Sequence, residues 1–414
     1  MMFRCSLSTM IATFVVACAG HSGDTDDNGD TSDTGEPAVC GDGVLGSGEA
    51  CDVPDNAGCD AACHLTGDLR WTVTRGGAGV WDSPVDVAVG ADGQVVLRVS
   101  GWNDELQQHI GTLIAYDSAG TQLWQADTSP AMRETDVPSR VAIGPDGSIY
   151  VQGWGLECFD PEGHRKWGES SPEQRTTTAI TLGDGALFSA SYGVGGGSVP
   201  DGPPPTDGRL HRRDPATGEV LWETVLAGDT PITLASTIAV VGSTLVAAGN
   251  VTADRPGDGH AFACVEAATG APVPCLAGEE VKDYTWLAAT PSGDLVVAMQ
   301  DHDEQAQIRR LSLEGVVRWT ITDPPAPGTV GDVVVGPDEW IATAARLGDP
   351  FTGRGSLRMY TDAGEPAWSV DFPPEHDGDH TVATAVAFGP GFLVIAGSEP
   401  TNDGVITWIR KLGP

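Results

Sequence analysis

The chain repeats a pattern of short hydrophobic runs separated by turns rich in glycine and aspartate. Residues 140–169 show it most completely: the apolar runs 141–143 and 148–152 flank Gly-Pro-Asp-Gly, a signal for a tight turn between two strands. A second pair of runs flanks the turn that begins at Asp160, and its last run ends at Trp167. This unit therefore predicts four antiparallel strands.

Versions of the unit recur about seven times between Asp86 and Lys411, with a tryptophan after the second turn in most copies. The fourth copy has Pro274 and Cys275 at this point instead. We expect the repeated tryptophans to pack between neighbouring copies. They are Trp71, Trp124, Trp167, Trp222, Trp319 and Trp368.

The last copy ends at Pro414 before its tryptophan strand, and a matching strand stands at the front of the array, at residues 69–74. A strand that one end of a repeat array supplies to the other closes a ring, and closure removes unpaired sheet edges. The pattern therefore predicts an all-β fold at residues 68–414. We expect a seven-bladed β-propeller, closed by an N-terminal strand around Trp71 that pairs with the segment around Trp408.

Strands that alternate in direction place their connections on two faces of such a ring. The turns within hairpins are short and share one face, whereas the other connections are long and unequal and share the second face. Because variable loops on a rigid frame usually carry recognition, we expect the second face to bind a partner. Its acidic and partly aromatic residues are Trp102, Asp104, Glu105, Asp201, Asp207, Asp254, Asp258, Asp349, His376, Asp377, Asp379 and His380.

Two short stretches resemble metal sites. His376 to His380 places two imidazoles and two carboxylates close together, but no helix fixes their geometry. Residues 24–29 match the opening of a calcium loop, but Gly35 stands where the loop needs a bidentate glutamate. We therefore predict no metal or other cofactor, with calcium as the alternative, and interpret these residues as solvated loop charges.

The first 17 residues have one positive residue, Arg4, and a moderately apolar run, as a secretory signal does. Val15-Val16-Ala17-Cys18 resembles a bacterial lipobox, in which cleavage precedes the cysteine and its thiol and new amino terminus are acylated. This resemblance implies a lipoprotein with lipid on Cys18, anchored at the outer membrane or cell surface, with the periplasmic face also possible. Ordinary secretion is the alternative.

Residues 18–39 are acidic and of low complexity, which predicts a disordered tether. Residues 40–67 contain Cys40, Cys51, Cys59 and Cys63, which predict a small module with two disulfides. All three pairings remain open, and zinc binding is the alternative. Residues 40–63 resemble the cysteine-rich repeat of myxobacterial secreted and surface proteins, although the usual Asp-Gly-Asn run after Asp52 is replaced by Val-Pro-Asp-Asn.

The turns at residues 117–124 and 160–167 share an Asp-x-x-Gly-x-x-x-Trp ending. With the Pro-Asp-Gly turn, this ending resembles the repeats of the quinoprotein-alcohol-dehydrogenase-like family and related WD40-like propellers. The resemblance covers nearly all of residues 68–414. It implies the fold, because such repeats occur in enzymes that hold pyrroloquinoline quinone and also in scaffold lipoproteins that hold nothing.

Three further cysteines lie within the repeats. Cys264 and Cys275 flank the turn at Thr269-Gly270, so we expect them to form a disulfide across the second hairpin of the fourth copy. Cys158 is left over, and we expect it to be a small buried residue, the alternative being a nucleophile.

The formal net charge of −36, with only 22 lysines and arginines, argues against nucleic acids and anionic lipid surfaces as partners. Cations or basic partners are compatible with it. The sequence has no adjacent cysteines, no Gly-x-Ser-x-Gly elbow, no His-Glu-x-x-His and no phosphate loop. We therefore predict no enzyme.

The predicted function is a membrane-anchored binding or scaffolding platform for a protein or another cell-envelope ligand. The main alternative is a propeller enzyme, either a quinone-dependent oxidoreductase or a calcium-assisted hydrolase that uses the axial channel. A purely structural envelope component is the third possibility.

Overall fold

A computed structural model describes residues 67–413 apart from 79–80, 104–107, 129–139, 154, 170–174, 194–207, 227–231, 233, 251–259, 277–283, 301–305, 324–327 and 350–351. The predicted signal, tether and cysteine-rich module lie outside the described residues. Within the described part, no helix has the length and apolarity needed to cross a membrane.

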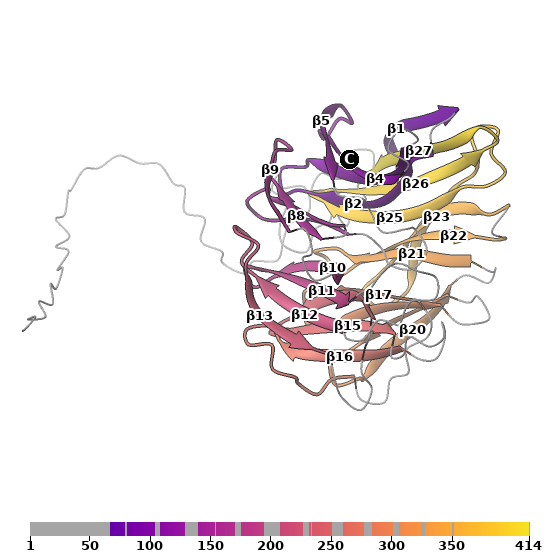
Figure 1. Ribbon diagram of the computed structural model, residues 1–414. Coiled ribbons are helices and arrows are strands. Elements are labelled where there is room, and N and C mark those ends of the chain that lie inside the picture. The colour runs from indigo at the N-terminus through magenta and orange to yellow at the C-terminus, as the bar shows by residue number, and fades with distance from the viewer. Residues whose placement is uncertain are drawn as a thin grey trace, which may run out of the picture. The chain divides into compact units, whose positions relative to one another are not determined.

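The described strands form seven sheets, each a blade of a propeller (Figure 1). Blade 1 contains β2 (Ser83–Val89), β3 (Val95–Asn103), β4 (Gln108–Tyr116) and β5 (Gln122–Thr128). Blade 2 contains β6 (Val141–Ile143), β7 (Ile149–Gln152), β8 (Leu156–Phe159) and β9 (Arg165–Glu169). Blade 3 contains β10 (Arg175–Gly183), β11 (Ala186–Gly193), β12 (Gly208–Arg213) and β13 (Val220–Val225). Blade 4 contains β14 (Leu234–Val241), β15 (Thr244–Asn250) and β16 (His260–Glu266).

The remaining blades complete the ring. Blade 5 contains β17 (Tyr284–Ala289), β18 (Leu295–Gln300), β19 (Ala306–Leu311) and β20 (Val317–Asp323). Blade 6 contains β21 (Gly328–Val335), β22 (Ile341–Leu347), β23 (Arg354–Tyr360) and β24 (Pro366–Phe372). Blade 7 contains β25 (Val382–Gly389), β26 (Phe392–Thr401), β27 (Gly404–Leu412) and, as its outer strand, β1 (Leu69–Ala78).

The predicted closure of the ring is confirmed. β1 pairs antiparallel with β27, so that Thr74 lies opposite Trp408 and Trp71 opposite Lys411 (Figure 1). The first strand of the repeat region thereby becomes the fourth strand of the last blade. Closure joins the two ends of the array through backbone hydrogen bonds and leaves no exposed end blade.

The hydrophobic core lies between neighbouring blades. Between blades 7 and 1, for example, Val394 and Ile409 pack against Leu97 and Ile114. The inner strands place residues toward both the blade before and the blade after, so nearly the whole of these strands is buried. This burial on both faces is why the inner strands appear in the sequence as short apolar runs.

The repeated tryptophans connect neighbouring blades, as predicted. Trp124 of blade 1 donates its indole N–H to the carbonyl of Pro161, 2.7 Å away in the β8–β9 turn of blade 2. Its ring lies against Gly163, where an added Cβ would be 2.6 Å from the indole. Equivalent indole bonds join Trp71 to Ser118, Trp167 to Pro215, Trp222 to Ala267 and Trp319 to Asp362.

Blade 4 differs from the other blades because it has three strands and no such tryptophan. Pro272 forms an isolated bridge with Val265, and proline cannot donate the hydrogen bonds of a longer strand. The segment is held by the Cys264–Cys275 disulfide, which the sequence predicts. The next residue, Leu276, donates its N–H to the carbonyl of Leu313 in blade 5 at 2.8 Å. This backbone bond takes the place of the missing indole bond.

The connections divide between the two faces as expected. The turns within hairpins are short, for example residues 184–185, 242–243 and 390–391, and we call their side the short-turn face. The other connections include residues 129–140, 194–207 and 373–381, and we call their side the long-connection face.

Candidate functional site

A cavity of about 390 Å³ lies on the axis of the propeller and is lined by the first strand of every blade. Its lining includes apolar residues such as Val87, Ile180, Ile238, Leu287 and Val386, but polar groups make up slightly more of its accessible surface than apolar groups do. The volume lies within the range of small-molecule pockets, which are typically apolar with a few convergent polar groups.

Three charged residues, in addition to Thr181 and Thr237, supply polar side chains to this cavity. Arg140, immediately before β6, places Nη1 2.8 Å from Oδ1 of Asp332 on β21 and 3.8 Å from Oδ1 of Asp86 on β2. Blades 2 and 6 are not neighbours, so the guanidinium spans the channel. Asp86 and Asp332 both lie near the middle of their first strands, so this charged cluster lies partway along the channel. We call these three residues the axial cluster.

Backbone N–H groups fix both carboxylates of the axial cluster. Asp86 accepts hydrogen bonds from Val87 at 2.9 Å and from Val141 of the next blade at 2.7 Å. Asp332 accepts the equivalent pair, from Val333 at 2.9 Å and from Val386 of its next blade at 3.2 Å. Each carboxylate therefore ties its blade to the following one and has little freedom to move.

Burial changes the proton affinities in the axial cluster. Burial raises the pKa of Asp86 to about 7; the nearby charge of Asp332 also raises it, whereas Arg140 and the two N–H donors lower it. Burial alone would lower the pKa of Arg140, but the attraction of Asp332 and Asp86 outweighs burial and raises it. Arg140 therefore stays positive, and Asp86 can exchange a proton near neutral pH.

The charges continue from the axis into the interface between blades 1 and 2. Arg98 on β3 lies directly opposite Asp86 and is fully buried, and burial lowers its pKa to about 10 against the opposing effect of Glu157 and Asp86. Glu157 on β8 pairs with Arg165 on β9 at 2.9 Å. From the axis to the rim, the charged residues are Asp332, Arg140, Asp86, Arg98, Glu157 and Arg165.

Sequence reasoning missed the axial cluster, although a signal was present. Asp86, Arg140 and Asp332 each stand directly before a short apolar run that ends in a turn glycine: Val-Ala-Val-Gly, Val-Ala-Ile-Gly and Val-Val-Val-Gly. A charge at one register of an otherwise apolar strand marks a position facing the channel or a partner charge.

The predicted binding face is described only in part. Asp349, His376, Asp377 and Asp379 are exposed, and His380 is half-buried. Trp102 lies on β3. Asp104, Glu105, Asp201, Asp207, Asp254 and Asp258 lie outside the described residues, as do Cys18, Cys40, Cys51, Cys59 and Cys63.

The loop from His376 to His380 is organised by Glu399, on β26. This buried carboxylate accepts N–H bonds from Glu375, His376 and Gly378, and its Oε2 lies 3.1 Å from Nδ1 of His376. Burial alone would raise the pKa of Glu399, but these hydrogen bonds lower it overall. Among the described residues, no group of three or more His, Cys, Asp or Glu side chains could hold a metal ion.

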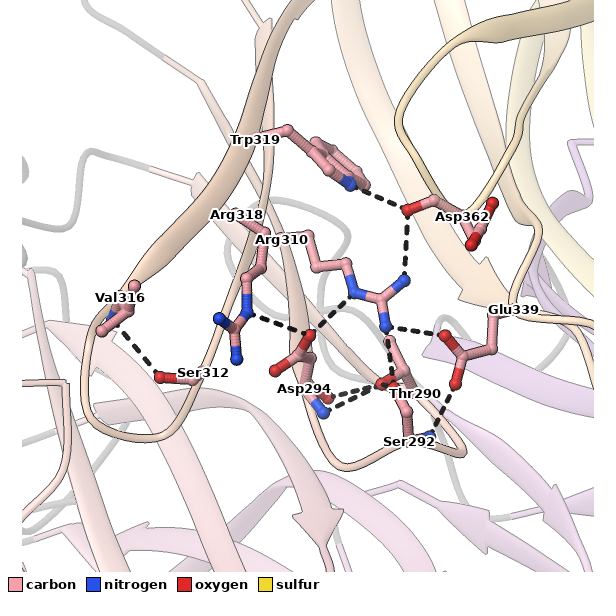
Figure 2. A network of polar contacts seen from close by, with 10 residues as sticks. All are labelled: Thr290, Ser292, Asp294, Arg310, Ser312, Val316, Arg318, Trp319, Glu339 and Asp362. Atoms are coloured by element: carbon pink, nitrogen blue, oxygen red, sulfur yellow. Dashed lines mark hydrogen bonds and ion pairs between the residues drawn. The ribbon is translucent and has the colours of Figure 1, made fainter.

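The short-turn face carries ion pairs that join neighbouring blades (Figure 2). Arg310 of blade 5 contacts Asp294 at 2.9 Å in its own blade and Glu339 of blade 6 at 2.6 Å. It also donates to the Asp362 carbonyl, which accepts the Trp319 indole bond as well (Figure 2). On this face, the turns serve to hold the blades together.

Cys158 is buried on β8. Burial raises the pKa of its thiol to about 11, so the thiolate needed for nucleophilic attack is scarce at neutral pH. The arrangement agrees with the predicted role as a small core residue.

No protein-family model matches the chain, and no curated protein matches it in sequence. Solved structures match its fold. The acylaminoacyl peptidase of Pyrococcus horikoshii is 11% identical over 77% of this chain, with a TM-score of 0.51, and this chain spans only 50% of it. The Pan2 WD40 domain of Neurospora crassa is 12% identical over 80% of this chain and 89% of that one, with a TM-score of 0.49.

The quinohemoprotein alcohol dehydrogenase of Comamonas testosteroni is 12% identical over 81% of this chain and 68% of that one, with a TM-score of 0.43. Identities this low show a shared fold and carry no information about activity. The strand pairing establishes the chain as an all-β, seven-bladed propeller.

Proposed function

We propose that this chain is an exported, lipid-anchored propeller that binds a partner through its long-connection face. The proposal rests on a structural difference between the two faces of the ring. The short-turn face is used by the indole bonds and the Arg310 network that join blades. The connections of the other face vary widely in length, from residues 402–403 to 194–207, and the ring does not need that variation.

The charge of the chain narrows the class of partner. A net charge of −36 attracts basic proteins and repels polyanions, and exposed Asp349 and Asp377 add to this on the proposed face. The proposed partner is therefore a basic protein or another cationic ligand of the cell envelope.

The anchor in this proposal rests on the sequence. Cys18 follows an apolar run and precedes the acidic tether, which would lift the propeller off a membrane surface, and the cysteine-rich module would sit between them. Cys18→Ala should abolish incorporation of labelled fatty acid and move the chain from the membrane to the soluble fraction. Cys5→Ala, within the same leader, should change neither. Membrane retention of the Cys18→Ala variant contradicts the anchor.

The binding face is tested with a photo-crosslinking residue placed at single exposed positions of the full chain in the cells that produce it. Positions 349 and 377 probe the long-connection face, and positions 162 and 362 are the matched probes on the short-turn face. We expect a discrete crosslinked species from the first pair only. Crosslinking from the second pair alone would overturn the proposed face, and none from either pair would favour a structural envelope component.

The enzyme alternative predicts a different result. A quinone- or calcium-dependent enzyme would retain the added cofactor and turn over substrate. Absorbance and activity of the purified full chain after addition of pyrroloquinoline quinone and calcium distinguish the two, since a binding platform shows neither retention nor turnover.

A further inference from the structure

The axial cavity has both apolar side chains and polar groups in its walls, and it contains two carboxylates that cannot easily move away. Side-chain exposure is 4% for Asp86 and 1% for Asp332, and each carboxylate is held by two backbone N–H groups. Arg140 is different. Its side chain is long and 20% exposed, and it contacts the carboxylates through the guanidinium at its end. Arg140 is therefore the member of the axial cluster that can rotate away.

The space between the two carboxylates is therefore a fixed binding position for a cation. In this structure the guanidinium of Arg140 occupies it. We propose that the axial cavity is a binding site for a small organic monocation, an alkyl- or arylammonium, whose charged group replaces the Arg140 guanidinium between Asp86 and Asp332 while its apolar part packs against the channel walls. This site is separate from the partner proposed for the long-connection face.

The charges around this binding position favour a cation over an anion. An anion bound to Arg140 would lie beside two fixed carboxylates, in a chain with a net charge of −36. Arg98 lies opposite Asp86, so with both aspartates ionised the cluster together with Arg98 is neutral while Arg140 is in place, and the departure of Arg140 leaves one excess negative charge that a bound cation balances. The apolar side chains along the cavity, such as Ile180, Ile238 and Leu287, then give the hydrocarbon body of an amine a contact that a hydrated metal ion does not use.

Arg140 acts in this proposal as a competitor within the chain. A ligand must displace the guanidinium of Arg140. The apparent affinity for the ligand is therefore lower, the larger the fraction of molecules in which the guanidinium lies between the carboxylates. Removing the guanidinium should therefore strengthen binding, whereas removing a carboxylate should weaken it. A structural salt bridge with no ligand predicts no binding in either case.

The test is calorimetric titration of the purified full chain with hexylammonium, and with hexanoate and hexanol as matched probes of opposite and zero charge. We expect hexylammonium alone to bind. Arg140→Gln should lower its Kd about tenfold or more, since the competitor is lost. Arg354→Gln, which breaks the exposed pair with Asp371 at 2.8 Å on blade 6, should leave the Kd unchanged.

Asp332→Asn should raise the Kd about tenfold or more. Because that variant can fail to fold, a series of amines provides a second measurement on the wild-type chain and on Arg140→Gln. Affinity should rise from methyl- to hexylammonium if the tail enters the cavity, and stay flat if amines only collect on the acidic surface. Binding of hexanoate, a flat series, or no binding to Arg140→Gln would each overturn the proposal.

Discussion

Arg140 and Asp332 form an ion pair at 2.8 Å across the axis, although they belong to blades 2 and 6. The pair links opposite sides of the ring across the cavity that the first strands line. Its energetic weight depends on burial, because a carboxylate that is 1% exposed cannot exchange its partners for water.

Asp332→Ala should therefore destabilise the propeller. The change removes the acceptor of two buried N–H groups, from Val333 and Val386, and leaves Arg140 without its nearest counter-charge. The expected loss in the free energy of unfolding is about 3–5 kcal/mol, measured by urea denaturation. Asp362→Ala is the control in the same blade, since that exposed residue makes its network contacts through its carbonyl. Equal losses in both variants would contradict this account.

Gly163→Ala should cost more than Gly185→Ala, although both glycines have positive φ, 85° and 64°. The backbone strain of alanine is common to both and amounts to about 1–2 kcal/mol. At Gly163 the new Cβ would also lie 2.6 Å from the Trp124 ring, whereas nothing lies within 4 Å at Gly185. Displacing the indole should add about 1–3 kcal/mol. Urea denaturation of both variants measures this difference, and its absence would show that the tryptophan contact contributes little.

Removing the disulfide in blade 4 should lower stability by about 3 kcal/mol, because a bond between residues 11 apart restricts the unfolded chain. Cys275→Ala and Cys264→Ala/Cys275→Ala should lose similar amounts, since the bond needs both thiols. Intact mass after alkylation, with and without reductant, reports the bond directly. Alkylation of both thiols without reduction would disprove it.

His211 should make stability depend on pH in the acid range. Burial, reinforced by Arg213, lowers its pKa from 6.5 to about 4, while Glu223 opposes the shift. The unfolded chain then takes up this proton first, so stability falls as pH falls from 6.5 toward 4, by about 3 kcal/mol in total. His211→Gln should flatten the slope of unfolding free energy against pH. An unchanged slope in this variant would contradict the assignment to His211.

The propeller could be predicted from the sequence because its rules are local. Short apolar runs, turn glycines such as Gly163 and the tryptophan that follows the second turn in most copies act within a few tens of residues. The exchange of the strand around Trp71 followed from counting repeats. The sequence indicated that blade 4 differs, because Pro274 and Cys275 stand where other copies have a tryptophan. It did not predict that this blade has three described strands.

The candidate site was less predictable. The long-connection face followed from loop lengths, but its clustered residues His376 and His380 suggested ligands, whereas the structure shows Glu399 holding that loop through backbone bonds. The partner of His376 is remote in the sequence and is set by the pairing of blade 7.

The sequence by itself determined the repeat, the number of blades and the strand that closes the ring, because these depend on side-chain periodicity and turn chemistry. Only the tertiary structure decided that Asp86, Arg140 and Asp332 meet at the axis. The distances between these three side chains depend on the circumference of the closed ring and on the direction of each first strand. Neither quantity is encoded in the sequence near any one of the three residues.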